Sequence, residues 1–311
     1  MAYEVRNRNN AEDAGALAKQ TATTVNGYLV KNRDAIIKTL PEGFNFDRMC
    51  RTVINAISTT PLLAKCSPGS LFLSTVRAFS LGLEPNGALS EGYLVPFWNS
   101  KKSCNEAQFM PSYRGLQQLS RRSGEITDIY AKEVFSKDIF EVEEGTERKI
   151  IHKPNYTAER GEPVCYYAVF HTKDGGVDFE VMSKAEIETV RAASKAANSG
   201  PWTQWYGEMA KKTVMKRLLK RAPMSIEASD KFSKALDTEN RAAMGEEANN
   251  ADILDIEGLE VPEEGDTPAE VQRAVNADRA KEISAKIAAA KKNDAASAVA
   301  GTTAKPEDNL V

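Results

Sequence analysis

In the first third of the chain, apolar residues recur at the spacing of a helix. Residues 46–58 (FDRMCRTVINAIS) and 67–85 (SPGSLFLSTVRAFSLGLEP) both carry this period. The second segment has Ser67 in the N-cap position, Pro68 in the first turn and Gly82 near its end, which are the usual signals of helix boundaries. The pattern predicts two core helices, and nothing in them points to chemistry.

From residue 92 onward, apolar and polar residues alternate as they do in β-strands. Residues 92–99 (GYLVPFWN) and 106–112 (EAQFMPS) flank a polar turn, so they predict a hairpin with Lys101 and Lys102 at its tip. The proline in each strand favours an edge position, because proline cannot donate a ladder hydrogen bond. Three further stretches continue the alternation, the last around an Asp-Gly-Gly turn suited to a tight hairpin: residues 126–135, 139–154 and 165–182.

A short helix interrupts these strands at residues 112–124 (SYRGLQQLSRRSG). Ser112 is its predicted cap, and the apolar positions leave Arg114, Arg121 and Arg122 on the outer face. Arg122 could instead cap the end of the helix. Helix returns after the strands at the capping box SKAE and is expected to run to about residue 197.

The most unusual segment is a densely basic helix at residues 208–223 (EMAKKTVMKRLLKRAP). Its apolar residues share one face, while Lys211 falls within that arc and is expected to be structural. The other face carries an i, i+4, i+8 stripe with two arginines beside it: Lys212, Lys216, Lys220, Arg217 and Arg221. No acid follows Glu208 within the basic run, and like charges at this spacing repel by a few tenths of a kcal/mol. The stripe therefore indicates a polyanion nearby, with a solvated surface or a subunit contact as the alternatives.

The order of elements predicts an α+β fold. We expect a central antiparallel β-sheet of four to six strands, built from hairpins and flanked by helices mostly on one side, then an acidic linker and a small helical C-terminal segment. The expected regions are a partly flexible N-terminal region (1–45), a core (46–223), a helical extension (224–248), the acidic linker (249–268), a C-terminal helical interaction segment (269–292) and a disordered tail (293–311).

The charge of the chain is unevenly distributed. Its formal net charge is −3, yet residues 1–223 carry 31 lysines and arginines against 25 acids, and residues 224–311 carry 10 against 19. The four cysteines and two histidines lack zinc-site spacing, and no stretch has the length and apolarity of a membrane span. The pattern favours a cytoplasmic protein with a mildly basic body and an acidic tail.

Three ordered segments resemble the RecT family of phage-type single-strand annealing proteins: residues 81–97 (LGLEPNGALSEGYLVPF), 107–126 (AQFMPSYRGLQQLSRRSGEI) and 179–223 (from FEVMSKAEIE to the basic helix). The resemblance implies a protein that binds single-stranded DNA and pairs complementary strands without ATP, in oligomeric rings or filaments. It also implies a partner exonuclease and a phage or prophage origin in a bacterial host. By this resemblance, residues 46–223 are the expected DNA-binding and annealing core, and residues 1–45 are expected to make oligomer contacts. Residues after 223 are not covered by the resemblance.

Annealing requires that a strand be held by its phosphates while its bases stay free, and a positive groove meets this need without reading sequence. No phosphate-binding GxxxxGK[ST] loop is present, so no cofactor is predicted and ATP is not needed; an influence of Mg²⁺ on DNA binding stays open. The predicted DNA-binding residues are the five basic residues of the stripe above, the outer arginines of the short helix, the hairpin-tip lysines and nearby aromatic residues: Lys212, Lys216, Arg217, Lys220, Arg221, Arg114, Arg121, Arg122, Lys101, Lys102, Tyr113, Phe97 and Trp98. No catalytic or metal-binding residue is predicted.

Two rival functions were weighed. A metal-dependent nuclease would use Asp138 with the ExK sequence at Glu147 and Lys149, and a sequence-specific DNA-binding regulator would need a helix-turn-helix that is not found. His152 and His171 are expected to be structural. The acidic C-terminal part either masks the basic groove or, as we prefer, docks an exonuclease or a host single-strand-binding protein.

Overall fold

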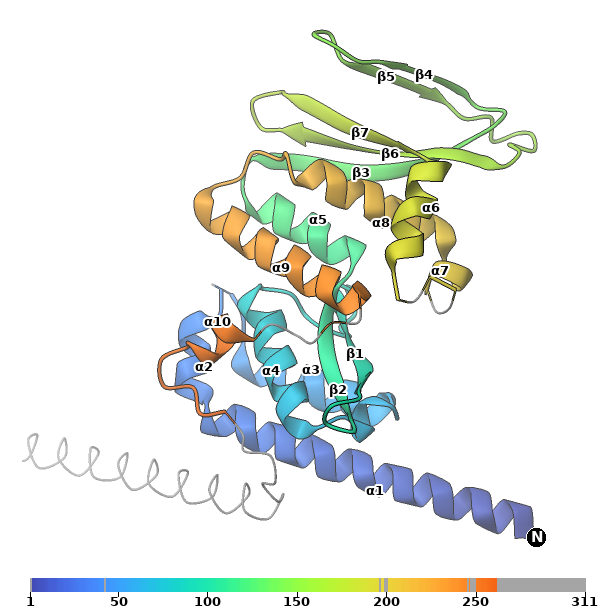
Figure 1. Cartoon of the computed structure of the whole chain (residues 1–311). Helices are drawn as coiled ribbons and strands as arrows, with labels where there is room; N and C mark the ends of the chain where they lie inside the picture. The colour runs from blue at the N-terminus through green and yellow to red at the C-terminus, as the bar shows by residue number, and fades with distance from the viewer. Residues whose placement is uncertain are drawn as a thin grey trace, which may run out of the picture.

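A computed structural model describes residues 2–41, 43–195, 197–198, 201–244, 246 and 250–261. The chain has the expected α+β composition, arranged in layers (Figure 1). A helical layer that contains α1 lies at one end, and a small antiparallel sheet covered by a further hairpin lies at the other. The predicted C-terminal helical segment and tail, with the end of the acidic linker, lie outside the described residues.

The helical end is built from α1 (Ala2–Lys31), α2 (Arg33–Thr39), α3 (Phe46–Thr59), the short 3-10 turn η1 (Leu63–Lys65) and α4 (Pro68–Ser80). The two predicted core helices are confirmed, and the hydroxyl of Ser67 accepts the backbone N–H of Ser70 as a cap should. The helix α1 was not predicted, because its polar sequence shows little apolar period. Val25 and Leu29 near its C-terminal end are nevertheless buried against α3 and α4.

The first hairpin, β1 (Gly92–Asn99) and β2 (Cys104–Pro111), packs against α4 and α9 (Ile226–Met244). It forms a two-stranded sheet of its own, which agrees with the prolines that favoured edge strands. Leu94 and Phe109 face each other in its register, and both are buried. The hairpin therefore lies between the helical end and the three-stranded main sheet.

The main sheet has three strands in the order β3 (Ile126–Phe135), β6 (Pro163–Thr172) and β7 (Val177–Ser183). One face is covered by α5 (Tyr113–Arg122) and α8 (Tyr206–Leu219), and the other by the hairpin of β4 (Ile139–Glu143) and β5 (Lys149–Lys153) (Figure 1). The expected single sheet of four to six strands is thus wrong. The β4–β5 hairpin packs Phe140 and Ile150 onto the sheet face, where they bury apolar surface, and does not extend a sheet edge.

Local signals at the helix ends are mostly confirmed. Ser183 and Glu186 form the predicted capping box at the start of α6 (Lys184–Ala193), which ends before the expected residue 197. A one-turn helix, α7 (Pro201–Gln204), precedes α8. In the Asp-Gly-Gly turn only Gly175 takes a positive φ, of 86°.

Residues 250–261 return to the helical end of the molecule, although they fall within the predicted linker. After α10 (Ala251–Leu254), the backbone at Glu260 pairs with Asn32, whose side chain donates to the Glu260 carbonyl at 3.0 Å and accepts from its N–H at 2.6 Å. Ile253 is buried in the core. The folded body therefore extends beyond the predicted boundary, and this part of the acidic segment is docked.

Candidate nucleic-acid interface

The basic helix α8 crosses one face of the main sheet and contacts all three strands. Its predicted apolar face is confirmed, because Val214, Met215, Leu218 and Leu219 are buried. Its N-terminal half lies toward β3, where Gly207 meets Glu133, and its C-terminal half lies toward β7, where Arg221 meets Glu180. Basic residues at different points of the helix therefore have different surroundings.

The prediction that Lys212 faces outward is wrong. Its side chain is only 10% exposed, and its Nζ donates to the backbone carbonyl of Pro111 at 2.9 Å and pairs with Glu239 of α9 at 3.1 Å. Lys216 also pairs with Glu239 and donates to Asn240 at 2.8 Å. The long aliphatic stem of a lysine can lie along an apolar surface, so a helical wheel does not fix where its charge ends.

The basic run has no acid of its own after Glu208, and Glu239 of α9 supplies one to Lys212 and Lys216 in the folded protein. Its side chain is 4% exposed between the two lysines. Burial alone would raise the pKa of Glu239, but the charges and hydrogen bonds of Lys212 and Lys216 outweigh burial and hold that pKa at about 2. Burial also lowers the pKa of Lys216, against the opposing effect of Glu239. These three residues, called here the buried triad, join α8 to α9.

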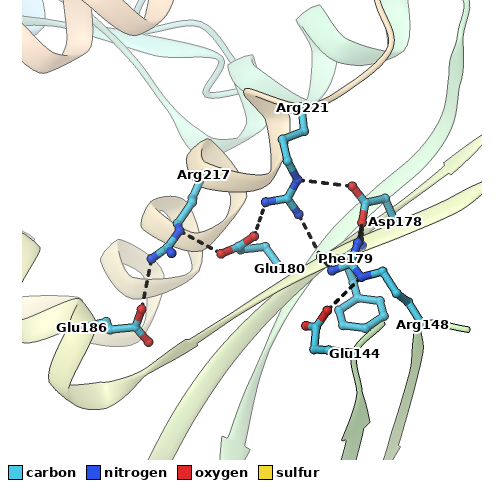
Figure 2. A network of polar contacts seen from close by, with 8 residues as sticks. All are labelled: Glu144, Arg148, Asp178, Phe179, Glu180, Glu186, Arg217 and Arg221. Atoms are coloured by element: carbon cyan, nitrogen blue, oxygen red, sulfur yellow. Dashed lines mark hydrogen bonds and ion pairs between the residues drawn. The ribbon is translucent and has the colours of Figure 1, made fainter. Parts of the chain in front are cut away.

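Arg217 and Arg221 are exposed but paired with acids of the sheet edge (Figure 2). Arg217 contacts Glu180 of β7 at 2.8 Å and Glu186 of α6 at 3.1 Å. Arg221 pairs with Glu180 and donates to the Phe179 carbonyl at 3.1 Å. The hydrogen bond with Glu180 is the main cause that raises the pKa of Arg221.

The same network reaches the turn of the β4–β5 hairpin. Arg148 donates to Glu144 at 2.9 Å and to the Phe179 carbonyl at 2.8 Å, pairs with Asp178, and lies 4.4 Å from the centre of the Phe179 ring (Figure 2). Four acids thus surround three arginines on this β7 edge. A DNA phosphate would have to replace carboxylates here, which makes this edge a weak place for DNA to bind.

Lys220 is the one member of the predicted stripe that is exposed and makes no ion pair among the described residues. Lys211 pairs with Glu208 at the solvent-facing start of the helix, and its side chain is 22% exposed. Whether any of these residues contacts DNA stays a prediction.

The predicted arginines of α5 fall into two groups. Arg114 and Arg121 are exposed, and Arg121 pairs with Asp128 of β3 at 2.7 Å. Arg122 turns toward the helical end, where it donates to the Gly82 carbonyl and lies 5.6 Å from the ring centre of Phe44. Its role in the structure is therefore to tie α5 to the end of α4.

Tyr113 connects α5 to the open edge of β3. Its hydroxyl hydrogen-bonds the backbone of Ala131, and Lys211 and Arg121 lie close enough to influence its pKa. Burial raises the pKa of Tyr113, and these two cations act in the opposite direction. The aromatic ring is half-buried.

The hairpin tip brings together the other predicted residues. Lys101 and Lys102 are exposed, and their backbone N–H groups donate to the Asn99 side chain at 2.9 and 3.2 Å. Lys102 also pairs with Glu106 at 3.0 Å. Trp98 beside them is 60% exposed, whereas Phe97 is half-buried. The tip therefore offers a rigid turn, cations and one exposed ring.

A cavity of about 320 Å³ opens at the edge of β3, and sequence reasoning missed most of its lining. Lys132 of β3 and Lys211 of α8 line it, together with Tyr156 and Arg160 from the loop between β5 and β6. Lys132 is exposed and makes no ion pair within the described part of the chain. Its position in a strand with alternating pattern was the only available signal, and that signal does not separate a binding lysine from an ordinary surface one.

The residues considered for a nuclease do not form a site. Both Asp138 oxygens are taken, by Arg160 at 2.9 and 2.6 Å and by His152 at 3.0 Å. Asp138 precedes β4 while Glu147 lies at the turn beyond the paired residues Glu143 and Lys149, about 17 Å away along the hairpin. The described residues contain no group of three or more His, Cys, Asp or Glu side chains placed to hold a metal ion.

Comparison with known proteins decides the family. Residues 45–253 match the RecT family. Protein RecT of Escherichia coli (strain K12) is 41% identical over 198 residues, which cover 63% of this chain and 73% of that protein. The chain belongs to the RecT family. It is accordingly a single-strand annealing protein that binds single-stranded DNA and is not an enzyme.

The match fits the folded body described above. It begins where α3 begins and ends within α10, so it reaches the first residues of the returning segment, which the sequence pattern assigned to a linker. Within the part of the chain that the structure describes, none of the helices has the length and apolar character needed to span a bilayer.

Proposed function

We propose that this RecT-family protein holds single-stranded DNA by its phosphates along the open edge of β3. The observation that carries the proposal is that cations from three elements distant in sequence lie at this edge. Lys132 of β3 and Lys211 of α8 line one cavity, and Arg121 of α5 pairs with Asp128 of β3, while Arg114 is exposed on the same helix as Arg121. We call these four residues and Tyr113 the β3-edge surface. Lys101, Lys102 and Trp98 of the hairpin tip, and Lys220 of α8, are proposed as further contacts.

The β3-edge surface suits the task of annealing. Cations that contact phosphates release counterions and carry no sequence information, so the bases remain available for pairing. Arg114 and Lys132 make no ion pair in the described structure, whereas Arg121 and Lys211 each face one exposed acid. Two to four phosphate contacts predict a slope of log K against log salt between about −1.4 and −2.8, at roughly −0.7 for each contact to a single strand.

Two further parts of the function are proposed from the family resemblance and the fold. Subunits associate on DNA, and the open edges of β3 and β7 offer places for such contacts. The C-terminal segment at residues 269–292 docks an exonuclease or a host single-strand-binding protein. The protein acts in phage or prophage recombination, in the cytoplasm of a bacterial host.

The test is strand annealing followed by energy transfer between two end-labelled complementary oligonucleotides, without ATP. The wild-type protein should accelerate pairing and leave both strands intact, and failure to do so would refute the proposal. Reversing Arg114 and Lys132 to glutamate should weaken single-strand binding and flatten its salt slope by about 1.4. Lys38→Glu on α2, another exposed lysine, is the matched control and should change neither quantity. Equal losses in both variants would mean that general charge, and not the β3-edge surface, binds the strand.

Lys220→Glu tests the remaining part of the predicted stripe. Because Lys220 makes no ion pair among the described residues, its reversal should leave folding unchanged. A drop in DNA affinity would extend the interface along α8. Unchanged affinity would confine the interface to the β3 edge and the hairpin tip.

A further inference from the structure

We propose that the cavity beside β3 takes one unpaired nucleobase of the bound strand, stacked on Tyr156. The inference rests on the proposed function, since it names what part of the DNA enters this cavity. It adds a base contact to an interface otherwise built from phosphate contacts.

Among the residues that the structure describes, Tyr156 is the most exposed of the large apolar and aromatic side chains, at 76%. It lies in the loop that leads from β5 to β6 and lines the cavity. The guanidinium of Arg160 lies 5.1 Å from the Tyr156 ring centre and 4.2 Å from that of Phe135, so Arg160 is held between two rings. With Arg160 against one side, most of the Tyr156 ring remains open to a ligand.

Arg160, which contacts this ring, is held firmly in place. Arg160 donates two hydrogen bonds to Asp138, whose side chain has no exposed surface. The hydrogen bond with Arg160 is the main reason that the pKa of Asp138 is held well below its usual range. The backbone N–H of Lys137 also donates to the Arg160 carbonyl at 3.0 Å. A base that stacks on Tyr156 therefore meets a cation that is already ordered, and ordering Arg160 adds no cost to binding.

The charges around the cavity nearly balance. Lys132, Lys211 and Arg160 contribute three positive charges, and three carboxylates offset them: Glu133 in the lining, Glu208 beside Lys211 and Asp138 beneath Arg160. The cavity is thus close to neutral, although Lys132 and Lys211 of its lining also contact phosphates in the proposed function. It does offer both donors and an acceptor beside an aromatic face, which suits the polar edge and flat surface of a nucleobase.

The volume agrees with this ligand. Pockets for small molecules begin at about 300 Å³, and a cavity of about 320 Å³ therefore has room for a base. Every base has a flat face, so stacking of this kind shows little sequence preference. One base held per subunit would fix the strand along the β3 edge while its neighbours stay free to pair.

The experiment compares two strands of equal length, oligothymidine and a fully abasic oligomer with the same phosphates, by fluorescence anisotropy with the full chain. Tyr156→Leu should weaken binding to oligothymidine by about 5- to 150-fold, the range for loss of one stacked base. Tyr156→Phe keeps the ring and should bind within about twofold of wild type. On the abasic strand, wild type and Tyr156→Leu should bind alike. Tyr93→Leu removes another exposed tyrosine, on β1, and should have no effect.

Three outcomes would overturn the inference. Tyr156→Leu could bind oligothymidine as tightly as wild type, it could lose as much affinity for the abasic strand, or Tyr93→Leu could show the same loss. Failure of this inference can be told apart from failure of the proposed function. If the wild-type protein anneals strands and the variants give any of these outcomes, only the base contact is refuted. A wild-type protein that binds neither strand refutes the proposed function itself.

Discussion

Replacing Glu239 by glutamine should strongly destabilise the protein, because it leaves the two lysines of the buried triad without their shared acid. Lys212 and Lys216 have side chains that are 10% and 19% exposed. Each loses most of its contact with water on folding, and Glu239 compensates both. Glutamine has nearly the shape of glutamate, so the change removes the charge and little of the packing.

The size of the effect follows from the pKa of Glu239. A pKa of about 2, against an ordinary value of 4.5, corresponds to about 3 kcal/mol in favour of the ionised carboxylate in the folded state. Removal of one partner from a buried ion pair typically costs about 3–5 kcal/mol, which agrees. For a folded body of this size, the loss predicts a fall in the melting temperature of roughly 6–12 °C.

The assay is urea denaturation of wild type and Glu239→Gln, followed by circular dichroism. Glu227→Gln on the same helix is the matched control, because Glu227 is 81% exposed in its pair with Lys231 and should contribute little to stability. A loss below about 1 kcal/mol for Glu239→Gln would refute the reasoning, since the lysines would then have to reach water in the folded protein.

The pH dependence gives an independent check. A folded-state pKa below the ordinary value means that the carboxylate of Glu239 stabilises the protein fully above pH 4.5, and that this stabilisation is lost as the pH falls toward about 2. The stability difference between wild type and Glu239→Gln should therefore be largest near neutral pH and shrink over that window. A difference that stays constant down to pH 2 would mean that charge is not its cause.

Three other changes test the fold. Gly115→Ala should cost more than about 2 kcal/mol in urea denaturation, because its new Cβ would lie 2.0 Å from a backbone carbonyl oxygen, whereas Gly69→Ala has open space and should be neutral or stabilising. Equal stability of the two variants would contradict the close approach. Asn32→Ala should cost about 1–3 kcal/mol and speed hydrogen exchange at the Glu260 amide, which loses its acceptor; unchanged exchange would show that Asn32 does not hold the returning segment. Lys216→Glu places a second carboxylate beside the buried Glu239 and should lower the melting temperature of the protein in the absence of DNA. A variant as stable as wild type would argue against the buried triad.

Local features of the fold could be predicted because they depend on neighbouring residues. The caps of α4 and α6 and the three hairpins follow from short patterns, and each is found where expected. The arrangement of the hairpins could not be predicted in this way. Apolar residues at alternate positions show that a strand has a buried face, but not whether it joins a sheet edge or covers a sheet face, as β4 and β5 do.

The charges of α8 show the same limit at the candidate site. The run lacks acids in sequence, yet its partners lie 23 residues away in Glu239 and 41 residues away in Glu180. An argument from spacing along one helix cannot find partners that only the tertiary fold supplies. Lys132 was missed for the converse reason, since an isolated lysine in a strand gains its meaning from Lys211 and Tyr156 beside it.

The contacts of Lys212 also affect how related sequences should be interpreted. Its ammonium group meets the end of β2 and the middle of α9 while its backbone belongs to α8, so three separate segments depend on it. Selection for a folded protein alone would keep a lysine at this position, even in a relative that had lost all contact with DNA. Conservation of a lysine at this position would therefore reflect the stability of the fold, whereas conservation or change at Arg114 and Lys132 would reflect DNA binding.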